Sequence, residues 1–219
     1  MNTCDLKCDF CNEFNGQSEQ IDRNIVTFRD EFILLTTLGC FREGYSLYLP
    51  ITHERSFANM SSVSLLDVEN DLDFIRRKIS EEYSSNVIIA EHGPGIEDMG
   101  ACCCDHAHMH IIPVDDPKHV FMEFFNTQQN VSMLNNFNEI RNFRQNAYIY
   151  LSCFSGQHLL WDDVRMFSRQ FVRQVCADLD HLGSFYNWRL YPFYENMVRT
   201  TQRLRECFQN EMAFNLARN

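Results

Sequence analysis

The sequence has little of what nucleic-acid binding, membrane insertion or secretion would require. Its 219 residues carry 19 Lys and Arg against 30 Asp and Glu, a formal net charge of −11, whereas proteins that bind long nucleic acids are normally basic. No apolar run approaches the ~20 residues of a transmembrane helix. The first residues, MNTCDLKCDFCNEF, lack the apolar stretch of a signal peptide. We therefore expect a cytoplasmic protein that uses neither long nucleic acids nor a membrane as partners.

A framework of disulfides is not expected either. A chain of this length buries about 70% of the surface that it exposes when unfolded, so its core needs no covalent links. In a cytoplasmic protein, ten cysteines act as buried hydrophobic residues, reduced thiols or metal ligands. Four have no obvious partner and are expected in the core: Cys40, Cys153, Cys176 and Cys207. We interpret Cys102, Cys103 and Cys104 as packing residues, because neighbours on a strand point to opposite faces.

Hydrophobic periodicity predicts an α+β fold with an antiparallel meander sheet and a flanking helix over roughly the first 115 residues. Strands are predicted over three segments rich in apolar and β-branched residues: a hairpin over 24–41, and single strands over 44–53 and 86–93. A helix is predicted over 67–83, where apolar residues recur every three or four positions. The alternation in HAHMHIIP, residues 106–113, predicts a strand that Pro113 ends.

We predict two units, a domain over residues 1–119 and a mostly helical extension over 120–219 that packs on it. The extension is expected to contain four elements: a helical stretch over 120–144, a hairpin around Ser155 and Gly156, and helices over 162–179 and 193–207. The helix predicted over 162–179 would carry three arginines spaced by four in one stripe: Arg165, Arg169 and Arg173. Such a stripe is usually solvated, and its alternative role is to bind phosphate oxygens.

The most informative segment for chemistry is CDHAHMHIIP, residues 104–113, which places His106, His108 and His110 at alternate positions. On a strand, alternate residues share a face and follow one another every ~6.6 Å, so we expect a row of imidazoles on an open surface. The pKa of an imidazole lies near neutral pH. Its neutral form can therefore attack phosphorus and leave again, which divides one displacement into two. A metal site is the main alternative, since histidines on one face also suit zinc.

A second informative pattern is the Cys-x-x-Cys pair of Cys8 and Cys11. Two neighbouring thiolates suit zinc, which takes four ligands in a closed structural site. The alternatives are a redox pair or two unrelated thiols. His53 and His106 are the natural further ligands, and Cys4 competes with them. Such a site can contribute ~10 kcal/mol or more to folding, and it would hold the N-terminal arm against the histidine strand.

The three histidines and their apolar neighbours resemble the motif His-φ-His-φ-His-φ-φ of the histidine triad (HIT) superfamily. The segment GYSLYLPITH, from Gly44 to His53, is similar to the strand that leads into an upstream histidine segment in this family. The order IIAEHGPG, a loop, and DHAHMHIIP is similar to a bacterial branch that carries Glu-His-Gly before the triad. The core pattern covers roughly residues 4–115, and the tail RQFVRQVCADL … NWRLYPFYENMVRTT resembles the C-terminal extension of that branch.

The resemblance implies a HIT-like fold and a nucleotidyl hydrolase or transferase. The nucleophile would be His108, which attacks an α-phosphate in line and forms a nucleotidyl-histidine that water or another acceptor resolves. His110 would bind and polarise the phosphate, and His106 would complete the catalytic triad. Zinc-bearing members and related galactose-1-phosphate uridylyltransferases hold their metal at positions that correspond to four residues here: Cys8, Cys11, His53 and His106.

Two residues near Gly44 depart from the family pattern. Tyr45 stands where the family often has a fourth histidine, and Thr37 stands where an acid usually holds the ribose hydroxyls. Four substrate-binding residues are nevertheless expected, two as substitutes for that acid and two from the extension: Glu91, His92, Gln170 and Arg173.

Three functions stay open on the sequence. The first is nucleotidyl transfer or hydrolysis on a phosphoanhydride, a phosphoramidate or a nucleotide sugar. The second is a metal-dependent hydrolase that uses the histidines as ligands, and the third is a nucleotide-binding sensor or interaction module without turnover, which Tyr45 and Thr37 favour slightly. The family commonly dimerises through its helix and a sheet edge, so a homodimer is considered as well, unless the extension blocks that edge.

Overall fold

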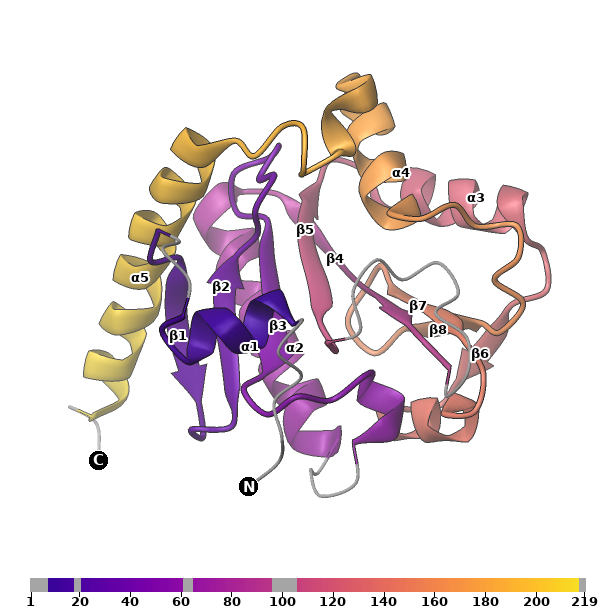
Figure 1. Ribbon diagram of the computed structural model, residues 1–219, viewed down its shortest axis with the longest axis horizontal. Coiled ribbons are helices and arrows are strands. Elements are labelled where there is room, and N and C mark those ends of the chain that lie inside the picture. Colours follow the sequence, from indigo (N-terminus) through magenta and orange to yellow (C-terminus); the bar gives the residue numbers. More distant parts are fainter. Residues whose placement is uncertain (1–7, 18–20, 61–64, 96–105, 217–219) are drawn as a thin grey trace.

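The computed structural model describes residues 8–17, 21–60, 65–95 and 106–216, with side chains as far as residue 209. Within these ranges an eight-stranded sheet crosses the molecule in the order β1-β2-β3-β5-β4-β7-β8-β6, and neighbouring strands pair antiparallel throughout. Helices lie on both faces of this sheet (Figure 1). The predicted α+β class with an antiparallel sheet is therefore confirmed.

The half of the sheet that carries the histidines has five short strands rich in apolar residues: β1 (Asn24–Phe28), β2 (Phe32–Thr36), β3 (Ser46–Pro50), β4 (Asn86–Gly93) and β5 (Met109–Val114). β1 and β2 form the predicted hairpin, and β3 and β4 occupy the two other predicted segments. The predicted helix is α2 (Leu65–Tyr83), which buries its regularly spaced apolar residues against one face of the sheet.

The strand of the histidine motif begins later than the alternation predicts. β5 starts at Met109, so His110 is the triad residue inside the strand, while His106 and His108 precede it. The backbone N–H of the alanine between them donates to the carbonyl of Glu54, at an N···O distance of 2.6 Å. This bond draws the segment away from the ladder, because a backbone donor engaged elsewhere cannot pair with a neighbouring strand.

Pro113 lies inside β5 and does not end it. Pro113 pairs with Val87 of β4, whereas the pairing of β3 with β5 ends at Ile111. On the β3 side, Pro113 therefore has no strand to which its backbone would have to donate, and its missing N–H is tolerated there. The proline ring also packs against Gly44, whose φ is +90°. A Cβ at Gly44 would lie 2.8 Å from Cγ of Pro113, so both the backbone conformation and the close approach require glycine there.

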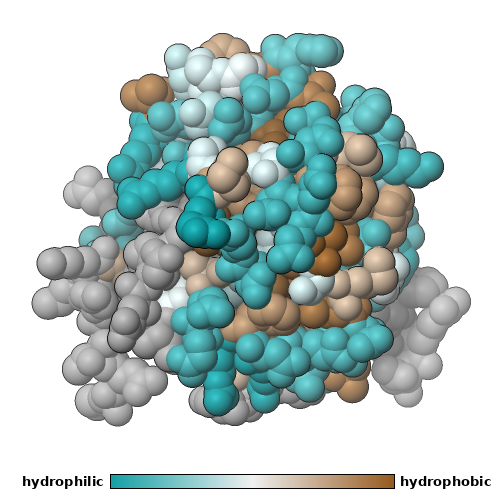
Figure 2. Space-filling model, turned by 90° about the vertical axis from the view of Figure 1, so that its right-hand side faces the viewer, coloured by the Kyte–Doolittle hydropathy of each residue, from teal (hydrophilic) through white to brown (hydrophobic). Residues whose placement is uncertain are grey.

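Residues beyond 119 add three strands to the same sheet: β6 (Ser132–Leu134), β7 (Tyr148–Ser152) and β8 (His158–Trp161). β7 and β8 form the predicted hairpin, and β7 pairs with β4. The edge of β4 that faces away from β5 is therefore occupied from within the chain. Figure 2 shows the side of α3 and β6 as a mixture of hydrophilic and hydrophobic residues. The side chain of Met133 in β6 is 77% exposed.

The helix predicted over 120–144 is wrong in part. The structure has α3 (Pro117–Thr127), then β6, then the 3-10 helix η2 (Phe137–Phe143). The polar run NTQQN, residues 126–130, begins in the last turn of α3 and offers no apolar stripe for a longer helix to bury, so the helix ends there.

The helix predicted over 162–179 is also shorter than expected. α4 (Phe171–Leu179) begins after Gln170, whose φ of 62° is left-handed and interrupts a right-handed helix. Arg165 and Arg169 therefore precede the helix, and the predicted arginine stripe does not form; Arg165 is exposed and pairs with Asp163. The last predicted helix is confirmed and extended as α5 (Tyr194–Leu216), which lies beside β1 (Figure 1).

The cysteines expected in the core are mostly confirmed. Cys40, Cys153 and Cys176 are buried in the apolar cluster between the sheet and α3 and α4, whereas Cys207 of α5 is half-buried. Cys4 and the run 102–104 lie outside the described residues. No helix in the described part of the chain is long and apolar enough to cross a bilayer.

Candidate active site and metal centre

His108 is held by the backbone just ahead of β5. Its Nδ1 lies 2.7 Å from the carbonyl oxygen of His106. A carbonyl oxygen only accepts hydrogen bonds, so Nδ1 carries the proton and the lone pair of the neutral ring is on Nε2. The orientation and tautomer of the ring are therefore set by the residue two positions earlier, which gives His108 a nucleophilic nitrogen at Nε2.

His110 is the closest imidazole to His108, with ring centroids 4.8 Å apart in an edge-to-face arrangement. Its Nδ1 lies 2.6 Å from the hydroxyl oxygen of Tyr45. Burial lowers the pKa of His110 well below its usual value, and the neighbouring His108, His92 and Arg173 lower it further. The lowered pKa favours the neutral form of His110, which can act as a hydrogen-bonding group.

The expectation of a row of imidazoles on an open surface is wrong. His106, His108 and His110 are only 1%, 5% and 8% exposed. The short helix α1 (Asp9–Phe14) covers the first two of them: the ring centroid of Phe10 lies 5.4 Å from that of His106 and 5.7 Å from that of His108. The three rings are therefore largely enclosed by the fold.

Four predicted metal ligands meet at the base of α1. The ligand atoms of Cys8, Cys11, His53 and His106 all lie within 4.8 Å of one another. Nδ1 of His106 is 3.3 Å from Sγ of Cys8 and 3.7 Å from Sγ of Cys11, and Nδ1 of His53 is 3.3 Å from Sγ of Cys11. The structure thus brings together residues that are up to 98 positions apart in the sequence.

This cluster fits a four-coordinate metal ion. Bonds of ~2.3 Å to sulfur and ~2.0 Å to nitrogen in a tetrahedron separate the ligand atoms by roughly 3.5 Å, close to the distances found. Nε2 of His106 lies 2.8 Å from the carbonyl oxygen of Pro50, so Nε2 carries the proton and Nδ1 presents its lone pair to the thiols, as a metal-binding histidine requires. Four protein ligands close the coordination sphere, which is typical of structural sites.

Glu91 and His92 are neighbours on β4 and face opposite sides of the sheet. His92 shares the face of His110, and the two ring centroids are 6.1 Å apart. Its Nε2 accepts a hydrogen bond from the backbone N–H of Val172 in α4, at 3.4 Å. Among the four predicted substrate-binding residues, His92 thus has a ring in contact with the triad.

Glu91 lies on the other face, under the 3-10 helix η1 (Phe57–Asn59). Its carboxylate accepts hydrogen bonds from the backbone N–H of Phe57, at 2.9 Å, and from the hydroxyl of Tyr148. Burial raises the pKa of Glu91 to about 7, and these hydrogen bonds oppose the rise. The residue anchors η1, and the nearby His108 also lowers its pKa, so its predicted role with the substrate stays a prediction.

The raised pKa of Glu91 predicts a pH-dependent stability. Between its ordinary value of 4.5 and about 7, the folded protein binds more protons than the unfolded chain, so stability falls as the pH rises through this range. Ionisation of Glu91 should lower the free energy of unfolding by up to about 3 kcal/mol. We expect Glu91→Gln to flatten the urea-unfolding profile between pH 5 and 8. Glu123→Gln, an exposed control on α3, should leave the profile unchanged, and an equally steep profile in both variants would refute the assignment.

Arg173 is buried and bound to the core domain. Its Nη2 donates to the carbonyl of Gly39 at 2.5 Å, its Nε to the carbonyl of Tyr186 at 2.8 Å, and its Nη1 lies 3.5 Å from Oγ1 of Thr37. The guanidinium carbon lies 5.0 Å from the ring centroid of Tyr45. Arg173 is therefore near the triad, but it is 3% exposed and its contact there is with Tyr45.

Gln170 precedes α4 and is half-buried. Its Oε1 is shielded from solvent and has no hydrogen-bond partner among the residues that the structure describes. A buried acceptor without a donor costs free energy, so this oxygen is suited to accept a hydrogen bond from a bound molecule. Its role in substrate binding stays a prediction.

Two residues near the triad were not assigned a role from the sequence. Phe10 lies between the two cysteines of the Cys-x-x-Cys pair, and that position indicates that metal binding would carry an aromatic ring to the histidines. Tyr45 was noted only as a departure from the family pattern. Its hydrogen bond to His110 depends on the packing of β3 beside β5, which no local pattern reveals.

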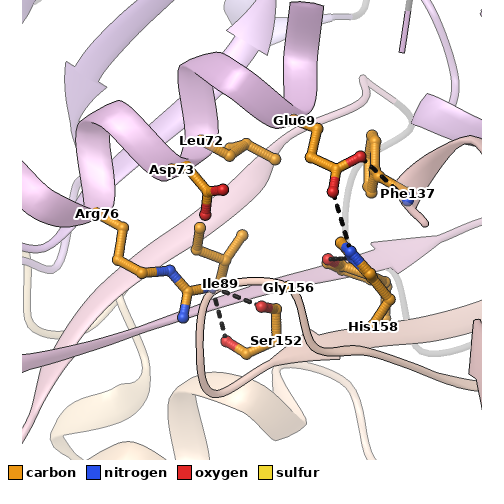
Figure 3. A pocket seen from close by; sticks show the side chains of 10 residues that line it. Glu69, Leu72, Asp73, Arg76, Ile89, Phe137, Ser152, Gly156 and His158 are labelled. Carbon is orange, nitrogen blue, oxygen red and sulfur yellow. Dashed lines mark hydrogen bonds and ion pairs between the residues drawn. The ribbon is translucent and has the colours of Figure 1, made fainter. Parts of the chain in front are cut away.

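A separate polar pocket lies on the α2 side of the sheet, away from His110. Figure 3 shows Glu69 and Arg76 of α2 pointing towards the β7–β8 hairpin. His158 lies between two partners there: its Nε2 is 3.1 Å from Oε1 of Glu69, and its Nδ1 is 2.9 Å from the hydroxyl of Tyr150. This buried tyrosine–histidine pair is chemically similar to Tyr45 and His110 but stands outside the candidate active site.

No protein-family model matches the chain, and no curated protein matches it. Solved structures of histidine triad proteins do match, and the similarity in fold extends over about half of this chain. A HIT-like protein involved in cell-cycle regulation from Bartonella henselae has 14% identity and a TM-score of 0.42, with 51% of this chain and 83% of that chain covered. A HIT family protein from Bacillus anthracis has 16% identity and a TM-score of 0.43, with 52% and 77% covered.

A third HIT structure is described as zinc-bound and comes from Mycobacterium smegmatis. It has 21% identity and a TM-score of 0.41, with 49% of this chain and 75% of that chain covered.

Proposed function

We propose that this protein is a nucleotidyl hydrolase or transferase in which Nε2 of His108 is the nucleophile. The observation that carries the proposal is the 2.7 Å hydrogen bond from Nδ1 of His108 to the carbonyl of His106, because it places the lone pair on Nε2. In this reaction Nε2 bonds to the α-phosphorus while the leaving group departs with the electron pair of its bond to phosphorus. Water or another acceptor then attacks phosphorus, and the N–P bond breaks.

His110 supports this step as a neutral hydrogen-bond donor. A donor aimed at a nonbridging phosphate oxygen stabilises the charge that develops as the nucleophile attacks. The substrate class is a small nucleotide with a phosphoanhydride, phosphoramidate or sugar-phosphate leaving group, as the resemblance implies. Whether a homodimer forms stays a prediction; any dimer through the outer edge of β4 would have to displace β7.

We propose further that Cys8, Cys11, His53 and His106 hold one structural zinc ion. Zinc bound there would contribute folding free energy and fix the N-terminal arm. His106 then has a dual role within the chain, since its ring faces the thiols and its carbonyl orients His108. The closed ligand set argues against a metal-dependent hydrolase, because that chemistry needs an open coordination position.

Trapping the covalent intermediate tests the proposed function. Wild-type protein incubated briefly with radiolabelled nucleotide substrate should carry one acid-labile adduct, which peptide mass spectrometry should locate on His108. The burial of the triad favours one alternative, a nucleotide-binding module without turnover. Tight nucleotide binding with neither adduct nor product across phosphoanhydride, phosphoramidate and nucleotide-sugar substrates would establish that alternative and reject the enzyme.

A further inference from the structure

Tyr45 and His110 form a buried hydrogen-bonded pair at the junction of β3 and β5. The hydroxyl oxygen of Tyr45 lies 2.6 Å from Nδ1 of His110, and the tyrosine is completely buried. The backbone of Tyr45 is also fixed, since its N–H donates to the carbonyl of Arg42 at 3.2 Å. The pair is therefore part of the folded core and not a contact between mobile side chains.

The direction of this hydrogen bond decides the tautomer of His110. A hydroxyl can donate to an imidazole nitrogen or accept from it. Arg173, which reaches the site from α4, has its guanidinium carbon 5.0 Å from the ring centroid of Tyr45, and a guanidinium has no acceptor for the hydroxyl proton. Within the described residues, Nδ1 of His110 is the one acceptor found for the hydroxyl of Tyr45. If Nδ1 donated instead, the hydroxyl proton would be buried without an acceptor, which costs free energy. The hydroxyl proton therefore points at Nδ1.

The protonation states agree with this direction. Burial raises the pKa of Tyr45 above its ordinary range, so the phenol keeps its proton. Burial lowers the pKa of His110, so the ring is neutral and has one N–H. A neutral imidazole that accepts at Nδ1 carries its proton on Nε2.

We infer that Tyr45 is the positioning residue of His110: with Arg173 of the C-terminal extension beside it, its hydroxyl donates to Nδ1 and holds the proton of His110 on Nε2. The effect of this tautomer on catalysis rests on the proposed function. His108 and His110 then have opposite tautomers, one with its lone pair on Nε2 and one with its proton there. The first ring attacks phosphorus and the second donates to a phosphate oxygen, so the extension takes part in the active site through Arg173.

Nitrogen-15 NMR of the imidazoles tests the tautomer without any nucleotide. In the wild-type protein, Nε2 of His110 should show a protonated, pyrrole-type shift and Nδ1 an unprotonated one. Tyr45→Phe removes the donor, so both nitrogens should move towards the averaged shifts of a tautomer mixture. A wild-type spectrum with the proton of His110 on Nδ1 would overturn the inference, and this measurement does not require the variant to fold.

Steady-state kinetics test the consequence for catalysis. Tyr45→Phe should lower kcat by roughly 10- to 100-fold, less than the ~10²- to 10³-fold loss for a transition-state donor that is removed outright, because some of the molecules keep the proton on Nε2. KM should change little. The matched control is Tyr150→Phe, which breaks the other buried tyrosine–histidine hydrogen bond and should leave both kcat and the His110 shifts unchanged. An unchanged kcat in Tyr45→Phe, or an equal loss in Tyr150→Phe, would overturn the positioning role. If no nucleotide is turned over by the wild type, the proposed function fails while the NMR result still decides the tautomer.

Discussion

Replacing His108 with alanine is expected to lower turnover of the nucleotide substrate by on the order of 10³-fold or more, and to abolish the labelled adduct. The reason is that His108 is the proposed nucleophile, whose lone pair is fixed on Nε2 by the carbonyl of His106. Losing a covalent nucleophile typically removes nearly all of the chemical step. The measurements are kcat/KM and adduct yield, beside a thermal melt that reports whether the fold persists.

His158→Ala is the matched control for this variant. His158 is 5% exposed, as His108 is, and it also makes buried hydrogen bonds, but it lies in the pocket on the α2 side of the sheet (Figure 3). We expect it to lose stability and to retain turnover per folded molecule. Wild-type turnover in His108→Ala would refute the nucleophile. A comparable loss of activity in the two variants would show that the effect reflects stability alone.

Removing the metal centre is expected to destabilise the protein more than any other single-site change considered. Cys11→Ser alters the thiol that lies near both histidines of the cluster. The wild type should carry one zinc per chain by elemental analysis and the variant much less than one. Because structural zinc sites can contribute ~10 kcal/mol or more, the melting temperature should fall by on the order of 10 °C or more. Removing zinc from the wild type with a chelator should lower its melting temperature towards that of Cys11→Ser.

Cys207→Ser tests whether the effect belongs to the cluster. Cys207 lies on α5, away from the four ligands, so this change should keep the zinc content and shift the melting temperature by little. Wild-type protein purified without zinc, with Cys8 and Cys11 joined as a disulfide, would contradict a metal centre and support the redox alternative. Zinc loss without any change in melting temperature would show that the ion does not stabilise the fold.

The elements that the sequence predicted well are those whose apolar residues repeat locally. The hairpin of β1 and β2, the helix α2 and the hairpin of β7 and β8 all follow such repeats. Predictions were wrong where a long-range or backbone effect decides. The histidine motif alternates like a strand, yet its first residues leave the sheet because the alanine between His106 and His108 donates to Glu54. Likewise, the left-handed backbone of Gln170 delays α4, and propensity alone does not fix such a conformation.

The sequence by itself determined which chemical groups are present and how they are spaced: three alternating histidines, a pair of cysteines two residues apart, and apolar periods that specify an antiparallel sheet with a flanking helix. Only the tertiary structure decided what each ring can do. A tautomer depends on the atom opposite each nitrogen, and those atoms come from distant segments, such as Tyr45 opposite His110 and Pro50 opposite His106. Burial works in the same way, since α1 covers His106 and His108 through contacts that span nearly one hundred residues.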